Sequence, residues 1–269
     1  MSRIGPLFQR LRASRAALMP FLVAGDPNLA ATFQSVEALV RAGADLIELG
    51  VPFSDPIADG PINQRAYQRA LAAGVTLRDV LGLVRDLRAR FGLPIVLLSY
   101  FNPLLQFGLD RFCAEAVASG VDGVVIPDLP ADEAADLARA ARAAGLDLIF
   151  LLSPTSTDAR IRLAVAQSSG FIYCVSLTGV TGVRNQLSGE VEGLVKRIRQ
   201  HTGLPICVGF GVSTADQARQ VGAMADGVIV GSAIVALLEE DGGPARLEEF
   251  VSGLRVALDG VHAGKSSPP

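Results

Sequence analysis

Three carboxylates occur close together in the first quarter of the chain, in a stretch that could carry out acid–base chemistry. Glu48 lies near the end of an apolar run, and a loop bounded by proline and glycine then supplies Asp55 and Asp59. Loops of this kind on a rigid scaffold often carry function. The chain has only two lysines and two histidines, so carboxylates are expected to perform most of any proton transfer.

Glu48 is a candidate for a general acid or base. Side chains alternate between the two faces of a strand, and if Ile47 and Leu49 pack outward against helices, Glu48 points inward. Removal from water would raise its pKa and let it give or take a proton near neutrality. From the spacing alone, an ion pair with a buried arginine or the capping of a loop amide is an equally good interpretation.

The two aspartates are less distinctive by position alone. Asp59 precedes Gly60-Pro61 and a predicted helix over 61–73, where a turn or N-cap role is the more natural interpretation. Asp55-Pro56 is typical of a turn.

Three glycine-containing segments late in the chain each lead toward a helix N-terminus. They are Thr178–Gly182, Gly209–Ser213 and Gly231–Ala233. Backbone N–H groups and the helix dipole at such places suit a phosphate. Tight turns alone would also explain any one of them, but the three together favour a phosphate site.

The residues that are missing narrow the chemistry. A Schiff-base aldolase needs a lysine at a strand end, whereas Lys196 falls within a predicted helix and Lys265 in the tail. A metal-dependent aldolase needs clustered histidines, and His201 and His262 are expected to be solvated surface groups, so no metal site is predicted. Carbon–carbon cleavage then requires a substrate that holds its own electron sink, such as an electron-rich ring that can be protonated on carbon.

The elements that must position these residues alternate between short β-branched apolar runs and Ala/Leu/Arg-rich helical patterns. Eight such units predict an α/β fold, a (β/α)8 TIM barrel with an extra N-terminal helix, in one domain over 1–263 and with a disordered tail over 264–269. An open doubly wound sheet is the alternative, weakened because no Gly-x-Gly-x-x-Gly follows the first strand. The predicted strands are Leu18–Ala24, Leu46–Val51, Ile95–Ser99, Gly123–Pro127, Leu148–Leu152, Phe171–Ser176, Ile206–Gly209 and Gly227–Val230.

Composition excludes several classes of function. The net charge is −3 and no basic block is present, so nucleic acid is not an expected partner. The two long uncharged stretches contain proline, glycine and polar residues, so no membrane span is predicted. Cys113, Cys174 and Cys207 lack paired spacing, which favours buried free thiols in a reducing, cytoplasmic compartment.

Taken in order, several motifs resemble the tryptophan synthase alpha subunit family over nearly the whole chain. The departure that we notice is Asn63, where an aliphatic residue is expected before Gln64. The matching motifs are Pro20–Pro27, Glu48–Pro61, Ser99–Pro103, Pro127–Pro130, Thr178–Gly182 and Gly209–Ser213.

The resemblance implies retro-aldol cleavage of indole-3-glycerol phosphate to indole and glyceraldehyde 3-phosphate. Glu48 would protonate indole C3 and help deprotonate the side-chain hydroxyl, and Asp59 would accept the indole N–H hydrogen bond. Tyr173 would assist, and Thr181 would lie in a loop that closes over the site. The phosphate would contact Gly182, Phe210, Gly211, Gly231 and Ser232; Phe21, Leu98, Tyr100, Leu151, Tyr173 and Phe210 would wall the indole pocket.

The resemblance also implies a partner, the pyridoxal-phosphate-dependent beta subunit, in an alpha2-beta2 heterotetramer. Since pyridoxal phosphate would belong to that partner, no cofactor is expected in this chain. Interface residues by resemblance are Pro56, Asn102, Asp128 and Pro130, for which turn and capping roles are equally good interpretations.

Two alternatives remain at the level of sequence. The first alternative is another sugar-phosphate barrel enzyme, such as indole-glycerol-phosphate synthase or phosphoribosylanthranilate isomerase. The synthase would need lysines at strand ends. A catalytically weak barrel that serves mainly as an activating subunit is the other, and the presence of both Glu48 and Asp59 speaks against it.

Overall fold

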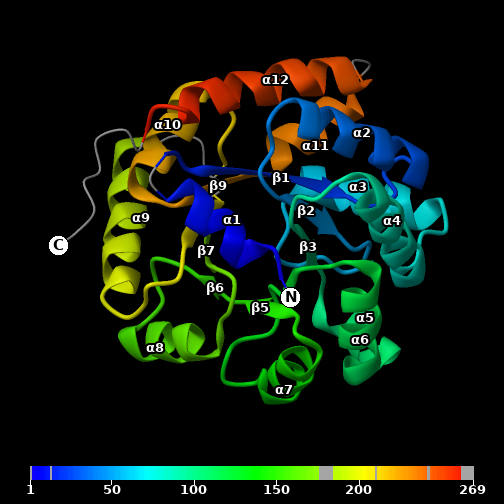
Figure 1. Cartoon of the computed structure of the whole chain (residues 1–269), viewed down its shortest axis with the longest axis horizontal. Coiled ribbons are helices and arrows are strands. Elements are labelled where there is room, and N and C mark those ends of the chain that lie inside the picture. The colour runs from blue at the N-terminus through cyan, green and yellow to red at the C-terminus, as the bar shows by residue number, and fades with distance from the viewer. Residues whose placement is uncertain (1, 13, 176–183, 210, 241–242, 262–269) are drawn as a thin grey trace.

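The strands form a parallel barrel surrounded by helices, as Figure 1 shows. The computed structural model describes residues 2–12, 14–175, 184–209, 211–240 and 243–261. Within these ranges the strands are β1 (Ala17–Val23), β2 (Ile47–Gly50), β3 (Ile95–Leu98), β4 (Gly123–Val125), β5 (Asp147–Ile149), β6 (Leu151–Leu152), β7 (Ile172–Val175), β8 (Ile206–Gly209) and β9 (Gly227–Val230).

The predicted fold is confirmed, and the fifth predicted strand is the one that differs. Phe150 interrupts it, so that β5 pairs with β4 while β6 pairs with β7. The strand order is β5-β4-β3-β2-β1-β9-β8-β7-β6, and every pairing is parallel. The open doubly wound alternative is therefore wrong, because β1 pairs with β9 at the other end of the chain.

Helices follow the strands around the outside of the barrel. They are α1 (Ile4–Leu11), α2 (Leu29–Arg41), α3 (Pro61–Ala72), α4 (Leu77–Arg90), α5 (Phe101–Phe107), α6 (Leu109–Ser119), α7 (Ala135–Ala144), α8 (Asp158–Gln167), α9 (Arg184–Arg199), α10 (Ala215–Met224), α11 (Ser232–Glu239) and α12 (Gly243–Leu258). No helix within the described ranges is both long and apolar enough to span a bilayer.

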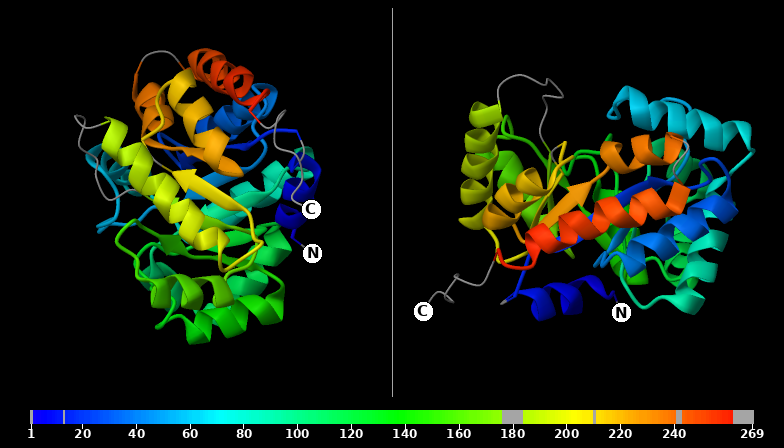
Figure 2. Two further views of the ribbon diagram at one scale, coloured as in Figure 1. Left: turned by 90° about the vertical axis from the view of Figure 1, so that its left-hand side faces the viewer. Right: turned by 90° about the horizontal axis from the view of Figure 1, so that it is seen from above.

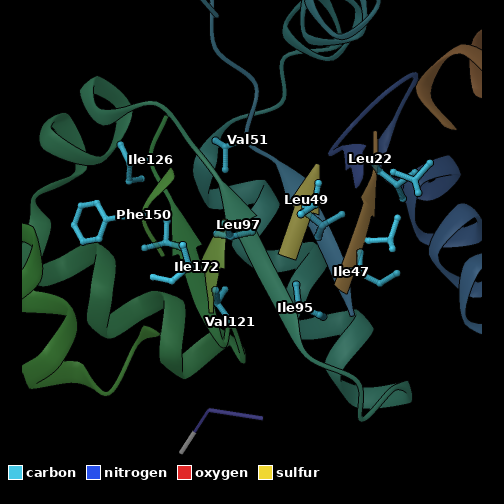
Figure 3. Packing of buried hydrophobic residues seen from close by; sticks show 14 of the residues in the cluster. Leu22, Ile47, Leu49, Val51, Ile95, Leu97, Val121, Ile126, Phe150 and Ile172 are labelled. Atoms are coloured by element: carbon cyan, nitrogen blue, oxygen red, sulfur yellow. The ribbon is translucent and has the colours of Figure 1, made fainter. Parts of the chain in front are cut away.

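Alternate strand residues supply two separate apolar clusters. Leu22, Ile47, Leu49 and Leu97 point outward and pack with the surrounding helices, as Figure 3 shows. The residues between them, such as Phe21, belong to a second cluster inside the barrel. Burial on both faces explains why the strand sequences are almost uniformly apolar.

The predicted N-terminal helix, α1, closes one end of the barrel. Its Ile4, Leu7 and Phe8 belong to the inner cluster, and the rings of Phe8 and Phe171 lie 6.1 Å apart. Figure 1 shows α1 across the middle of the ring, and Figure 2 shows it at one end. With the N-terminal ends of the strands covered, the opposite end is left for a site, as in other barrels of this kind.

Buried aspartates tie neighbouring strands together at the covered end. Asp45 accepts a hydrogen bond from Leu18 N–H at 2.9 Å, and Asp122 accepts one from Ile95 N–H at 2.9 Å. Both are also paired with arginines, Asp45 with Arg15 and Arg255 and Asp122 with Arg3 and Arg88. These contacts satisfy backbone donors at the starts of strands that would otherwise be buried without partners.

The sequence around the helix starts predicts N-caps at Asn28, Asp110, Asp158 and Ser213 or Thr214, and a capping box at Thr76 and Asp79. The structure confirms only part of this prediction. The capping box of Thr76 and Asp79 is present, and Asn28 and Thr214 cap their helices. Asp110 and Asp158 are not caps: each lies in the first turn of its helix, one after Gly108 and the other after Thr157. The helix dipole favours an acidic residue both at the N-cap and in the first turn, so the sequence does not distinguish a cap from a first-turn residue.

Candidate active site

Glu48 lies on the inner face of β2. Its backbone is in register with Phe21 of β1 and Val96 of β3, both members of the inner cluster. The side chain is 2% exposed, and neither carboxylate oxygen has a hydrogen-bond partner among the residues that the structure describes. The alternatives of an arginine pair or a capped loop amide find no support within that part of the chain.

The environment of Glu48 favours its neutral form. Burial raises the pKa of Glu48 to about 8, and the nearby Asp59 carboxylate adds to the shift. An acid with such a pKa is largely protonated at neutral pH and can donate that proton to a bound molecule. The geometry therefore provides a buried carboxyl group inside the barrel with a pKa suited to general-acid chemistry.

Asp59 lies in the loop between β2 and α3 with both carboxylate oxygens engaged. Its Oδ2 accepts a hydrogen bond from the Tyr100 hydroxyl at 2.6 Å, and its Oδ1 accepts one from Asn63 Nδ2 at 2.9 Å. Burial raises the pKa of Asp59, while these two hydrogen bonds act in the opposite direction. The N-cap interpretation is wrong, because Gly60 is the N-cap of α3 and no side chain caps it.

Asp55 has the turn role favoured for it. The carbonyl of Asp55 accepts from Ile57 N–H at 2.8 Å, and Pro56 accepts from Asp59 N–H at 3.0 Å in the turn that follows. The Asp55 side chain is exposed and contacts the hydroxyl of Ser54. This turn delivers Asp59 to its position.

Tyr173 lies on β7 in the inner cluster, 8% exposed. Burial raises the pKa of its phenol well above the usual value, and the charge of Glu48 is the next contribution. A Cβ on Gly209 would lie only 2.7 Å from the Tyr173 hydroxyl oxygen, so the ring needs glycine on the neighbouring strand β8. The structure thus brings Tyr173 to the same interior as Glu48.

Tyr67 is a site residue that the sequence analysis missed. It comes from α3, is fully buried in the inner cluster, and its hydroxyl has no partner within the described ranges. A Cβ on Gly50 would lie 2.9 Å from that hydroxyl oxygen, which places the phenol beside the end of β2. The signal in the sequence was its spacing of four residues from Asn63, which puts these two side chains on one face of α3.

The expected walls of an indole pocket are largely brought together. Phe21, Leu98 and Tyr173 are members of the inner cluster, and Leu151 packs against it. Tyr100 differs, because its ring stacks on Phe53 at 5.2 Å while its hydroxyl binds Asp59. Of these wall residues, Phe210 lies outside the described residues.

Three of the expected phosphate residues, Gly211, Gly231 and Ser232, occur just after β8 and β9. Gly231 is the N-cap of α11 and Ser232 is its first residue, exposed to solvent. The first turn of a helix presents N–H groups without acceptors inside the helix. Gly231 also lies next to Phe21, since a Cβ on this glycine would be 3.5 Å from the ring, and Gly211 follows β8. Gly182, Phe210 and the closure residue Thr181 lie outside the described residues.

One ion-pair network fixes α3 in place. Arg69 binds Asp26 at 2.7 Å and Glu239 at 2.7 Å, and Arg65 also binds Glu239 at 2.7 Å. Because Asp26 follows β1 and Glu239 ends α11, the helix that carries Asn63 and Tyr67 is held to both neighbours.

Three of the expected interface residues, Pro56, Asp128 and Pro130, lie in loops that follow β2 and β4, whereas Asn102 lies in the first turn of α5 after β3. Asn102 and Asp128 are exposed, and Asp128 accepts a hydrogen bond from Phe101 N–H at 2.9 Å, so it also binds the start of α5. Pro56 and Pro130 are half-buried.

Other parts of the described chain add no further candidate for the same chemistry. No group of three or more His, Cys, Asp or Glu side chains with the geometry of a metal site occurs within the described ranges. A cavity of about 480 Å³ lies under α1 at the covered end, lined in part by Arg12, Arg15 and Arg199, and none of the site residues above lines it.

Comparisons with known proteins agree with one another. A family model described as "Tryptophan synthase alpha chain" matches residues 8–257. The tryptophan synthase alpha chain of Geobacter sulfurreducens is 53% identical over 262 residues, which cover 96% of this chain and 99% of the relative. That of Chloroflexus aurantiacus is 50% identical over 263 residues, covering 97% and 99%.

Solved structures give the same result. A chain of tryptophan synthase from M. tuberculosis matches with a TM-score of 0.89 at 39% identity, covering 97% of this chain and 100% of the other. Tryptophan synthase subunit alpha from Legionella pneumophila matches with a TM-score of 0.87 at 37% identity, covering 96% and 98%.

Proposed function

The chain belongs to the tryptophan synthase alpha chain family, and on that premise we propose that Glu48 and Asp59 are the groups that carry its chemistry. The family catalyses the alpha reaction of tryptophan biosynthesis, and this chain is a lyase that breaks a carbon–carbon bond in that reaction. It cleaves indole-3-glycerol phosphate into indole and glyceraldehyde 3-phosphate. The single observation that supports the assignment of Glu48 is its fully buried carboxyl group, without a partner within the described ranges and with a pKa raised to about 8.

The proposed sequence of proton transfers balances without an outside reagent. Neutral Glu48 donates its proton to indole C3, and the ring becomes an iminium-like indolenine whose N–H is held by Asp59. The resulting Glu48 carboxylate removes the proton from the hydroxyl on the carbon bonded to C3. That carbon becomes the aldehyde as its bond to C3 breaks, and the electron pair returns to the ring. Glu48 ends as it began, protonated.

Asp59 is suited to the electrostatic part of this reaction. Its two hydrogen bonds come from neutral donors, Tyr100 and Asn63, and no arginine or lysine of the described chain is paired with it. Each carboxylate oxygen keeps a further lone pair for the indole N–H. The negative charge of Asp59 stabilises the positive charge that develops on the ring in the transition state. It stabilises the neutral bound substrate less, so the barrier is lowered.

We assign the substrate phosphate to the loops after β7, β8 and β9. Support comes from the first turn of α11, where Gly231 and Ser232 offer backbone N–H groups, and from Gly211 after β8. Gly182 and Phe210 complete the proposed set, and Thr181 is proposed to close over the site.

The indole ring is assigned to the interior near Glu48. Phe21, Leu98, Leu151 and Tyr173 supply apolar surface there, and Phe210 and Tyr100 are proposed to contribute from its rim. Tyr173 assists by donating its hydroxyl hydrogen, because burial keeps its phenol neutral.

Members of the family are the alpha subunit, which carries no cofactor of its own. We assign pyridoxal phosphate to a beta subunit that takes over the indole, in an alpha2-beta2 assembly. The proposed contact surface comprises Pro56, Asn102, Asp128 and Pro130. Support comes from Ile57, 82% exposed beside Pro56, and Leu105, 51% exposed in the helix that carries Asn102, since exposed large apolar side chains suit a protein contact.

A reducing, cytoplasmic location is part of the proposal. Its support is the burial of Cys113, Cys174 and Cys207 as free thiols.

The experiment that tests the proposal is an assay of indole release from indole-3-glycerol phosphate, with and without a beta subunit. Glu48→Gln retains the shape but cannot exchange the proton, so turnover should fall by about 10²–10⁴-fold or more. Glu249→Gln makes the same substitution at an exposed helical position and should leave turnover unchanged. Normal turnover in Glu48→Gln would refute the role of Glu48.

Asp59→Asn is the companion variant. It should lose turnover severely while still binding glycerol 3-phosphate, because the phosphate site is made by other elements. A variant that has lost its fold, as seen by circular dichroism, would instead assign Asp59 a structural role.

A further inference from the structure

The residue that departs from the family pattern lies directly against the proposed catalytic aspartate. Asn63 is in the first turn of α3, and its Nδ2 donates to Asp59 Oδ1 at 2.9 Å. The aliphatic residue expected at this position could not make that bond. The amide oxygen of Asn63 is buried and has no hydrogen-bond partner among the described residues, so no competing hydrogen bond through this oxygen holds the side chain.

The Asp59 carboxylate is held from two different elements. Tyr100, at the start of α5, donates to Oδ2 at 2.6 Å, and Asn63 donates to Oδ1 from the helix that follows the loop. Gln64 Nε2 binds the backbone carbonyl of Asp59 at 2.8 Å, which fixes the main chain but not the carboxylate. Two neutral donors on opposite oxygens therefore set the rotation of the carboxylate plane, and among the described residues only Asn63 donates to Oδ1.

We infer that Asn63 is a positioning residue, whose amide fixes the Asp59 carboxylate in its ionised form and in the orientation that receives the indole N–H. The inference rests on the proposed role of Asp59 and deepens it. In this chain the aspartate gains a hydrogen bond that an aliphatic side chain at position 63 could not make.

The electrostatic surroundings make this support consequential. Burial raises the pKa of Asp59, and the hydrogen bonds from Tyr100 and Asn63 oppose that rise. Among the described residues, the other titratable groups that face the site are Glu48 on β2 and the phenols of Tyr67 on α3 and Tyr173 on β7. Glu48 and the phenols are neutral at pH 7 and none brings a positive charge, so the ionised form of Asp59 depends on neutral donors.

The consequence is a change in the pH dependence of the reaction. If the ionised Asp59 is required, kcat/KM falls on the acidic side as Asp59 becomes protonated. Loss of the Asn63 hydrogen bond raises the pKa of Asp59, so the acidic limb should move to higher pH. A hydrogen bond to a charged group corresponds to a shift of about one pH unit. Below the limb, kcat/KM at a fixed pH should then fall by about ten-fold.

The test compares the pH profile of kcat/KM for the wild-type chain, Asn63→Leu and Asn63→Gln. Asn63→Leu should move the acidic limb upward by about one unit and leave the alkaline limb, set by Glu48, in place. Asn63→Gln retains an amide donor and should recover part of the shift. The control is Gln64→Leu, which loosens the same loop but removes no bond to the carboxylate, and its acidic limb should not move.

A second measurement does not depend on turnover. In chains labelled with ¹³C-aspartate, the chemical shift of the Asp59 carboxyl carbon reports its titration directly, and the midpoint should rise in Asn63→Leu by the same amount as the kinetic limb.

The outcomes separate this inference from the proposed function. Unchanged acidic limbs and an unchanged Asp59 midpoint in Asn63→Leu, together with an inactive Asp59→Asn, would overturn the role of Asn63 alone. Full turnover in Asp59→Asn would remove the proposed function of Asp59 and this inference with it. Equal shifts in Asn63→Leu and Gln64→Leu would show a purely structural effect and would also overturn the inference.

Discussion

The hydroxyl of Tyr100 lies 2.6 Å from Oδ2 of Asp59 and donates to it. The same hydroxyl oxygen accepts from Ala58 N–H at 3.0 Å, so one phenol fixes both the carboxylate and the loop that carries it. Sequence analysis expected Tyr100 only as an apolar wall. Burial and the contact with Asp59 raise the pKa of its phenol, so it acts as a neutral donor.

Tyr100→Phe removes this donor while retaining the ring that stacks on Phe53. We expect kcat/KM for indole release to fall by about 10- to 100-fold, because a hydrogen bond to a charged group is lost. The thermal midpoint should change by only a few degrees, roughly what one lost hydrogen bond costs in a chain of this size. A value of kcat/KM within two-fold of the wild type would mean that the Tyr100 contact does not support catalysis.

The alkaline limb of the pH profile is expected from Glu48. Its pKa is raised to about 8, so the carboxyl is protonated below that pH and can donate to indole C3. Activity should therefore be present at neutral pH and be lost as the pH rises through about 8. Asp59 contributes to the shift, so in Asp59→Asn the ¹³C-monitored titration of Glu48 should move to lower pH. A Glu48 titration that remained near 4.5 would contradict the assigned acid role.

Glu48→Gln should also stabilise the protein, by an amount that increases with pH. The folded chain holds the Glu48 proton up to about pH 8, whereas the unfolded chain releases it near 4.5. Wild-type stability therefore falls, through this group, as the pH rises from about 4.5 to 8, and then stays level. Glutamine has no such titration, so the variant should melt at least about 3 °C above the wild type at pH 9.

The difference between the two melting temperatures should shrink as the pH is lowered toward 5, where both side chains are neutral in the folded chain. Scanning calorimetry at pH 5, 7 and 9 measures it. A constant difference across this range would show that folding does not raise the pKa of Glu48.

The covered end of the barrel allows a test of stability that leaves the site untouched. Asp122 is 2% exposed and accepts from Arg3, Arg88 and Ile95 N–H. Asp122→Ala leaves a half-buried guanidinium and a buried backbone donor unpaired, so we expect a loss of about 3–5 kcal/mol in the free energy of unfolding, measured by urea denaturation.

The matched control is Asp110→Ala. Asp110 forms an exposed pair with Arg139, so its removal should change the free energy of unfolding by at most about 1 kcal/mol. Comparable losses in the two variants would mean that the buried pair of Asp122 contributes no more than a surface pair.

The amino-acid sequence by itself determined the barrel, because the strand runs are apolar on both faces and alternate with amphipathic helical patterns. It also placed Glu48 on the inner face, since Ile47 and Leu49 fix the alternation on β2. These are local patterns of period two or near four, and they need no knowledge of distant contacts.

Only the tertiary structure decided which partners these residues meet. The interruption of the fifth strand at Phe150, the hydroxyl of Tyr100 on Asp59 and the burial of Tyr67 all depend on segments far apart in the chain. Asp59 is an example: its own sequence neighbours suit a helix cap, and the phenol that engages it instead comes from Tyr100, between β3 and α5. Long-range packing overrides a local preference when the contacts it creates are stronger than the cap it replaces.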